Sequence, residues 1–166
     1  MRRRSATLAM LLLLPVVFES EFPTATGAED SPHPGQKTGE AWTNRRTKME
    51  FLWCEPGTFT MGSPKQEPER SEDEDQVPVT LTRGFWLGKY EVTQEQWKAV
   101  MKTEPWDGRI RVRIAPDSPA CWLSWDQAHL FCQELTRQER ESGALPGDWE
   151  YVLPTEAQWE FACRAG

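Results

Sequence analysis

The chain has 166 residues, of which 38% are hydrophobic, and a formal net charge of −7. Its length predicts one folded domain. An acidic chain without a clustered basic face lacks the electrostatic footprint of a nucleic-acid-binding protein, and it gives no reason to expect attraction to anionic membranes.

The N-terminus has basic, apolar and small residues in the order that is typical of a secretory signal peptide. Arginines at positions 2–4 precede an apolar run over residues 6–18, and small residues follow up to Ala28. The run is shorter than the roughly 20 apolar residues that span a bilayer, so a cleaved signal is favoured over a membrane anchor. We expect cleavage after Ala28, with Ser20 and Ala25 as alternatives. The protein is then exported to the periplasm or the extracellular space, without stable membrane insertion.

Removing residues 1–28 takes away three basic and two acidic residues and leaves a net charge of −8. Residues 29–50 are rich in Ser, Pro, Gly, Thr and charge and show no apolar period, which predicts a disordered lead-in. The folded part is therefore expected to span residues 51–166.

Short extended segments open this folded part. An apolar run at 51–54 is followed by polar and apolar residues that alternate at 58–61 and again at 77–81, as in half-buried strands. Residues 85–90 form a further extended apolar segment. The acidic stretch at 65–76 lacks the glycine and the spaced final glutamate of a calcium loop, so we expect a solvated surface loop there.

Three helix starts carry the same capping box, in which a Ser or Thr is followed three residues later by Gln. They begin at Thr93, Ser124 and Thr155, and Val92 and Trp97 form a hydrophobic staple across the first. The expected buried faces are Trp97, Val100 and Met101, then Ala128, Phe131, Cys132 and Leu135, then Trp159, Ala162 and Cys163. Gly166 stands where the third helix is expected to end.

Between the helices the chain is irregular, and it is rich in tryptophan. Arg109, Arg111 and Arg113 alternate and would share one side of a strand, where a solvated face is favoured over an anion site. Tryptophans on predicted inward positions are expected to pack in the core (Trp86, Trp97, Trp125 and Trp159). Trp106 and Trp122 lie in irregular segments, where core packing is favoured over a groove lining.

The cysteines and histidines give no sign of a metal site. Four cysteines, Cys54, Cys121, Cys132 and Cys163, predict disulfides in an exported protein, with three possible connectivities. The chain has two histidines, His33 and His129, and no Cys-x-x-Cys, so the usual zinc-ligand spacing is absent.

Four blocks in this order resemble the formylglycine-generating (sulfatase-modifying) enzyme family. They are residues 55–62 (EPGTFTMG), 90–94 (YEVTQ), 123–128 (LSWDQA) and 153–166 (LPTEAQWEFACRAG). They stand in register within residues 51–166 and are strongly specific in combination. The chain departs from the family pattern at Pro119-Ala120, where Pro-Val is usual, and at Val152, where Arg is common.

The resemblance implies an α+β fold with much irregular structure, related to the C-type lectins and here truncated to its N-terminal part. Complete enzymes of the family oxidise a sulfatase cysteine to formylglycine with oxygen and a copper ion held by two cysteines, and often bind structural calcium. Those residues follow the signature at 153–166, so the resemblance implies no catalytic, cofactor-binding or metal residue in this chain. It also suggests the pairing Cys132–Cys163, which leaves Cys54–Cys121.

Three functions are compatible with the resemblance. The chain belongs either to a cysteine-oxidising enzyme or to a non-catalytic exported binding or scaffold module, with a sulfatase peptide or another exported protein as partner. An iron-dependent relative is disfavoured because His129 lies on a predicted helix without a second histidine nearby. The chain as given is expected to be inactive.

Overall fold

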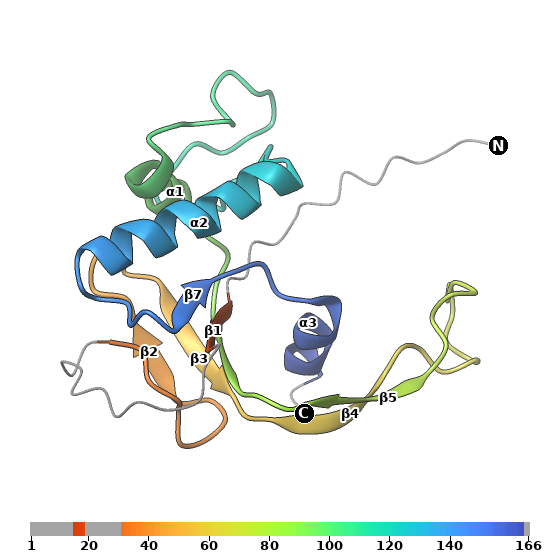
Figure 1. The fold of residues 1–166 in the computed structure, drawn as a ribbon. Coiled ribbons are helices and arrows are strands. Elements are labelled where there is room, and N and C mark those ends of the chain that lie inside the picture. The colour runs from red at the N-terminus through yellow and green to blue at the C-terminus, as the bar shows by residue number, and fades with distance from the viewer. Residues whose placement is uncertain (1–14, 19–30, 165–166) are drawn as a thin grey trace.

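The computed structural model describes residues 15–18 and 31–164, and these form the expected α+β fold (Figure 1). The strands in this part of the chain are β1 (Pro15–Phe18), β2 (Ala41–Thr43), β3 (Glu50–Cys54), β4 (Gly57–Met61), β5 (Val77–Leu81), β6 (Phe85–Gly88) and β7 (Trp149–Tyr151). The helices are α1 (Gln94–Met101), α2 (Trp125–Glu141) and α3 (Glu156–Cys163). The strands expected around residues 58–61, 77–81 and 85–90 are confirmed.

The strands form two antiparallel sheets. The larger has five strands in the order β2-β3-β6-β1-β7, and the smaller is the β4–β5 hairpin. In the larger sheet Trp53 of β3 lies opposite Trp86 of β6. β6 is therefore paired along both edges, with β3 on one side and β1 on the other.

The two faces of the larger sheet carry different helices, because successive residues of a strand point to opposite faces. On one face Phe51, Trp53 and Trp86 pack in a core with residues of α1 and α2. On the other face a second cluster forms around α3, made of Cys54, Phe59, Phe85, Leu87 and Phe161. Figure 1 shows α1 and α2 together on one side and α3 over the β4–β5 ribbon.

All three helices begin where the capping boxes predict. The hydroxyl of Thr93 accepts the backbone N–H of Gln96 at 3.2 Å, and the Gln96 side chain accepts the N–H of Thr93 at 2.9 Å. Ser124 and Thr155 cap α2 and α3 in the same way. A cap of this kind contributes about 1 kcal/mol to helix stability. The apolar stripe expected on α2 is also confirmed, since Ala128, Phe131, Cys132 and Leu135 are all buried.

The expectation of a disordered lead-in is wrong for the described residues 31–50. Ala41–Thr43 form β2, which pairs with β3. The centre of the Trp42 ring lies 5.1 Å from that of Phe51 and 6.2 Å from that of Trp86, so this aromatic residue packs the polar segment against the core. The composition of residues 29–50 could not predict this order, because it depends on packing against residues elsewhere in the chain, such as Trp86. Residues 29 and 30 lie outside the described part, as do Gly166 and most of the predicted signal peptide.

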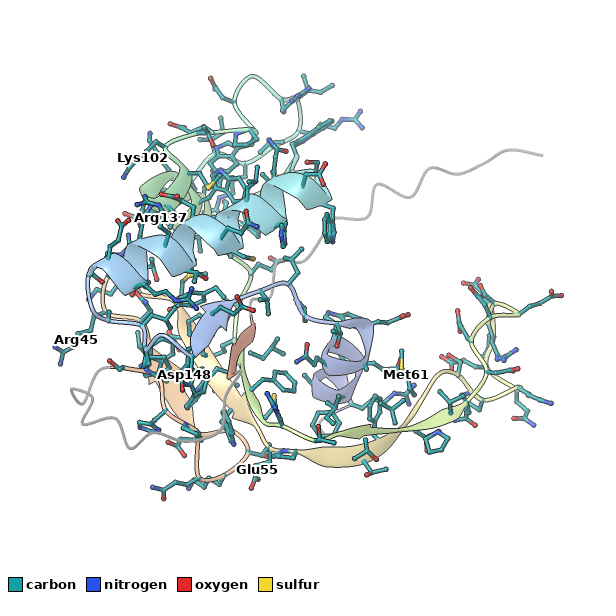
Figure 2. All side chains as sticks on the ribbon, viewed as in Figure 1. Arg45, Glu55, Met61, Lys102, Arg137 and Asp148 are labelled. Atoms are coloured by element: carbon teal, nitrogen blue, oxygen red, sulfur yellow. The ribbon has the colours of Figure 1, made fainter. Side chains whose placement is uncertain are left out.

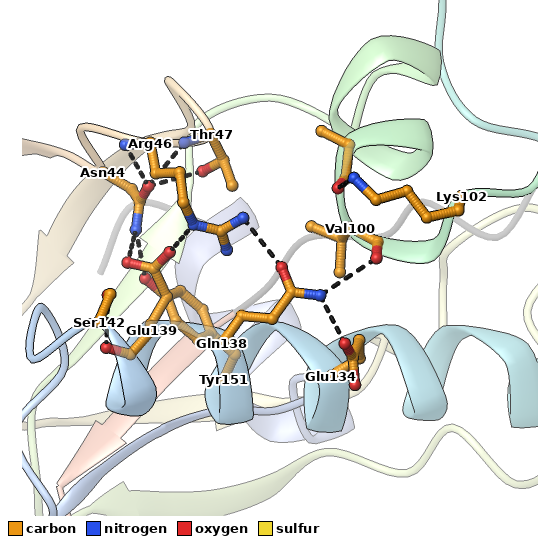
Figure 3. Close-up of polar contacts among 11 residues, drawn as sticks. Asn44, Arg46, Thr47, Val100, Lys102, Glu134, Gln138, Glu139, Ser142 and Tyr151 are labelled. Atoms are coloured by element: carbon orange, nitrogen blue, oxygen red, sulfur yellow. Dashed lines mark hydrogen bonds and ion pairs between the residues drawn. The ribbon is translucent and has the colours of Figure 1, made fainter.

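A buried polar network fixes the turn after β2 to the end of α2 (Figure 3). The carboxylate of Glu139, which is 1% exposed, accepts Asn44 Nδ2 at 2.7 Å and Arg46 Nε at 2.5 Å. Asn44 Nδ2 also donates to the Tyr151 hydroxyl at 3.0 Å, while Asn44 Oδ1 accepts the backbone N–H and the hydroxyl of Thr47. Burial raises the pKa of Tyr151, with the nearby Glu139 charge adding to the effect. Each member is satisfied, so the network holds β2, α2 and β7 in one arrangement.

Two of the expected inward tryptophans point outward. Trp125 is 59% exposed and Trp159 is 43% exposed. Trp86 and Trp97 are buried, as expected. The capping boxes therefore predicted where α2 and α3 begin, but not on which side of each helix the tryptophan lies.

The predicted inner face of α3 is confirmed for Ala162, which packs against the α3 cluster, but not for Trp159 and Cys163, which are exposed. The buried residue of this helix is Phe161, which packs edge-on against Phe59 of β4 with ring centres 5.4 Å apart. Met61 of β4 packs against the same cluster. The helix turns Phe161 inward because β4 offers these two apolar side chains on the facing side.

The arginine-bearing segment is a loop and not a strand. Residues 102–124 are irregular, and Lys102, Arg111 and Trp122 have φ angles of 58°, 63° and 60°. These left-handed conformations break the extended backbone that a shared arginine face would require. Trp106 is buried at the base of this loop, so the core packing favoured for its ring is confirmed. Its indole N–H has no hydrogen-bond partner among the described residues.

We expect Asn44→Ala to destabilise the protein by about 1–3 kcal/mol, because the substitution leaves the buried Glu139 and Thr47 groups short of partners. Urea unfolding of the full chain measures the change. The control is Gln133→Ala on the exposed face of α2, expected within about 0.5 kcal/mol of the parent. Equal stability of the two variants would show that the network does not hold the turn.

Candidate functional site

The candidate site is a hollow of about 1020 Å³ on the α3 side of the larger sheet. Its apolar lining includes Leu52 of β3, Leu87 of β6 and Phe161 of α3. Figure 2 shows side chains of α3 and of the β4–β5 ribbon directed toward each other, with Met61 between them. The hollow lies beside this contact, where α3 leaves part of the sheet face uncovered.

Charged and aromatic groups line another part of the hollow. Lys89 Nζ lies 2.9 Å from Glu50 Oε2 and 4.9 Å from the centre of the Tyr90 ring. The hydrogen bond to Glu50, and then the contact with Tyr90, raise the pKa of Lys89. Tyr90 is 60% exposed. An apolar lining with a few polar groups suits a ligand that has both an apolar side chain and a polar backbone.

The four cysteines are free thiols in the structure, so neither Cys132–Cys163 nor Cys54–Cys121 is formed. Cys132 is buried in the core beneath α2, whereas Cys163 is exposed at the end of α3 and lines the hollow together with Cys54. Cys121 packs against the α2 core and Cys54 belongs to the α3 cluster. Each expected pair is therefore divided between the two faces of the sheet.

These thiols do not fit the two-cysteine copper site that the family resemblance implies. Metal ligation requires thiolates. Burial raises the pKa of Cys54 to about 11 and that of Cys132 to about 12, so both are protonated near neutral pH. Within residues 15–18 and 31–164, no group of three His, Cys, Asp or Glu side chains is placed to hold a metal ion.

The remaining residues singled out in the sequence lie away from the hollow. His129 stacks on Trp125 with ring centres 5.3 Å apart and contacts Gln133 at 3.1 Å. The Arg109 guanidinium lies 4.7 Å from the centre of the Trp122 ring. The structure does not bring either pair to a common site with the cysteines.

Sequence reasoning missed the polar residues of the hollow. The pattern places Lys89 and Tyr90 in an extended apolar segment, but β6 ends at Gly88 and the next two residues turn into the hollow lining. The signal that was available is the Gly88-Lys89 step, where the apolar run meets a charged residue.

The sequence profile of the FGE-sulfatase family, described as the sulfatase-modifying factor enzyme 1-like domain, matches residues 37–166. The chain belongs to this family. The match begins before residue 51, in agreement with the ordered β2. No helix among the described residues is long and apolar enough to cross a membrane.

The chain is similar to two further proteins, one in structure and one in sequence. PvdO from Pseudomonas aeruginosa has a TM-score of 0.65 and 25% identity, over 80% of this chain and 53% of that one. The chaperone protein LppX from Paenibacillus barcinonensis is 29% identical over 113 residues, which is 53% of this chain and 38% of that protein. The chain thus spans about half or less of the length of these two proteins.

We expect Cys163 to be alkylated at least ~10-fold faster than Cys54 or Cys132 in the folded protein, because a buried, protonated thiol is a poor nucleophile. Timed labelling with iodoacetamide at pH 8, followed by peptide mass spectrometry, measures each rate. Cys163→Ser should remove the fast phase, whereas Cys132→Ser should leave it in place. Uniform labelling of all four cysteines would contradict the burial.

Proposed function

We propose that this chain is the polypeptide-binding part of an FGE-sulfatase family protein, and that residues 1–166 by themselves do not oxidise cysteine. The observation that carries the proposal is the hollow beside α3, with its apolar lining and the Glu50–Lys89 pair. An extended peptide could place an apolar side chain against Leu52 and Leu87 while its backbone meets the charged groups. A sulfatase peptide is the partner that the family suggests.

The oxidation of a peptidyl cysteine to formylglycine is the proposed activity of the complete protein. It needs a copper site of two thiolates, a ligand set suited to Cu(I). Cys121 and Cys132 lie on the other face of the sheet from the exposed Cys163, and Cys54, which lines the hollow with Cys163, is buried. We therefore assign the copper site, and any structural calcium, to residues beyond these 166.

A non-catalytic exported binding or scaffold module is the second candidate. The similarity to a protein named as a chaperone favours it, because such a module would use the same hollow to hold a polypeptide without changing it. The two candidates share the binding step and differ in whether the complete protein oxidises the bound cysteine.

The test of binding uses a fluorescent cysteine-containing peptide from a sulfatase and the full chain. Leu52→Asp should weaken binding by at least ~10-fold, since losing the burial of one apolar side chain costs about 1.5–3 kcal/mol. The control is Leu130→Asp, which changes an exposed leucine of α2 outside the hollow and should leave the affinity within about twofold. Equal affinity of the two variants would remove the hollow as the binding site.

The test of catalysis incubates the full chain with the same peptide, Cu(I) and oxygen. Mass spectrometry should find the peptide cysteine unchanged. Formation of formylglycine by residues 1–166 alone would contradict the proposed lack of activity, whatever the binding measurement shows.

A further inference from the structure

The N-terminal segment fills an inner position of the five-stranded sheet. β1 lies between β6 and β7 and runs antiparallel to both, with Val16 opposite Trp86 on one side and Tyr151 on the other. The same four residues belong to the apolar run that the sequence assigns to a signal peptide. One segment is thus both a predicted leader and a strand within the fold.

Without β1, the sheet would contain a slot one strand wide. β7 pairs with β1 alone among the described strands, and the second edge of β6 is also paired with β1. Every residue of β6 is buried, as are Trp149 and Tyr151 of β7. Unpaired backbone N–H and C=O groups at such a place are costly, because buried polar groups require partners.

β7 has contacts to α2 in addition to its pairing with β1. The backbone N–H of Tyr151 donates to Thr136 Oγ1 at 2.9 Å, and Arg140 donates to the carbonyl of Trp149 at 2.9 Å. α2 therefore holds β7 in place, while β3 holds β6. Both walls of the slot therefore have contacts besides those to β1.

We propose that the slot between β6 and β7 is an acceptor site for one short apolar strand supplied by another polypeptide. Pro15–Phe18 occupy it in the uncleaved chain and show the kind of segment that it takes: a short apolar strand, antiparallel to both neighbours. Backbone hydrogen bonds provide the affinity, as in other cases of strand addition to a sheet edge. Removal of the leader opens the site.

The first test compares backbone hydrogen exchange in the full chain and in Val17→Pro. Proline removes a backbone donor from β1, so the amides of Trp86 and Glu150, which lie opposite Val16 and Val17, should exchange at least ~10-fold faster. The control is Thr26→Pro, which introduces the same residue outside β1 and should leave these amides unchanged. Equal exchange in Val17→Pro and the parent would overturn the proposal.

The second test remains informative if Val17→Pro is poorly folded. A protease site placed at residues 22–28 of the full chain allows the leader to be cut after folding. Native mass spectrometry should find the leader still bound, and excess peptide spanning residues 13–21 should displace it, whereas the same peptide with Val17→Pro should not. Failure of the peptide to bind, whether the cut leader is lost or stays in place, would show that the slot is not an acceptor.

Discussion

β6 is the strand on which the other elements depend, because both of its edges are paired and both of its faces are packed. Trp86 lies edge-on to Trp53 at 5.3 Å, and its indole N–H donates to the His33 carbonyl at 2.8 Å. Gly84, just before the strand, admits this packing: a Cβ there would lie 2.3 Å from the Trp53 ring. A larger residue at this position would push the two central strands apart.

Successive residues of β3 and β6 face opposite sides of the sheet, and this alternation explains why the hollow lies on the side of α3. Trp86 faces the α2 core, while Phe85 and Leu87 face α3 and the hollow. Because α3 covers only part of its face, an apolar surface remains beside the Glu50–Lys89 pair, and this is the surface assigned to a polypeptide. The acceptor slot depends on the same strand, but on its edge rather than its face. Binding in the hollow and strand exchange are therefore separate properties of β6.

Local sequence patterns predicted the elements whose causes are local. The caps at Thr93, Ser124 and Thr155 and the buried stripe of α2 follow from residues within one or two helical turns. The position of β2 cannot be predicted from such local patterns. It depends on the packing of Trp42 against Phe51 and on the hydrogen bond from Asn44 to Glu139, 95 positions later. The hollow could not be predicted either, since it joins β3, the residues after β6, and α3. The four motif blocks predicted the family but not these contacts.

The most direct test of this arrangement is whether the cysteines are divided between the two faces of the larger sheet. Peptide mapping of the purified, folded protein under non-reducing conditions reports any disulfide between α2 and α3. The structure predicts that no Cys132–Cys163 peptide is found, because the sheet separates the core beneath α2 from the end of α3. Recovery of a Cys132–Cys163 peptide in high yield would contradict this arrangement, since the two helices would then have to lie on the same face.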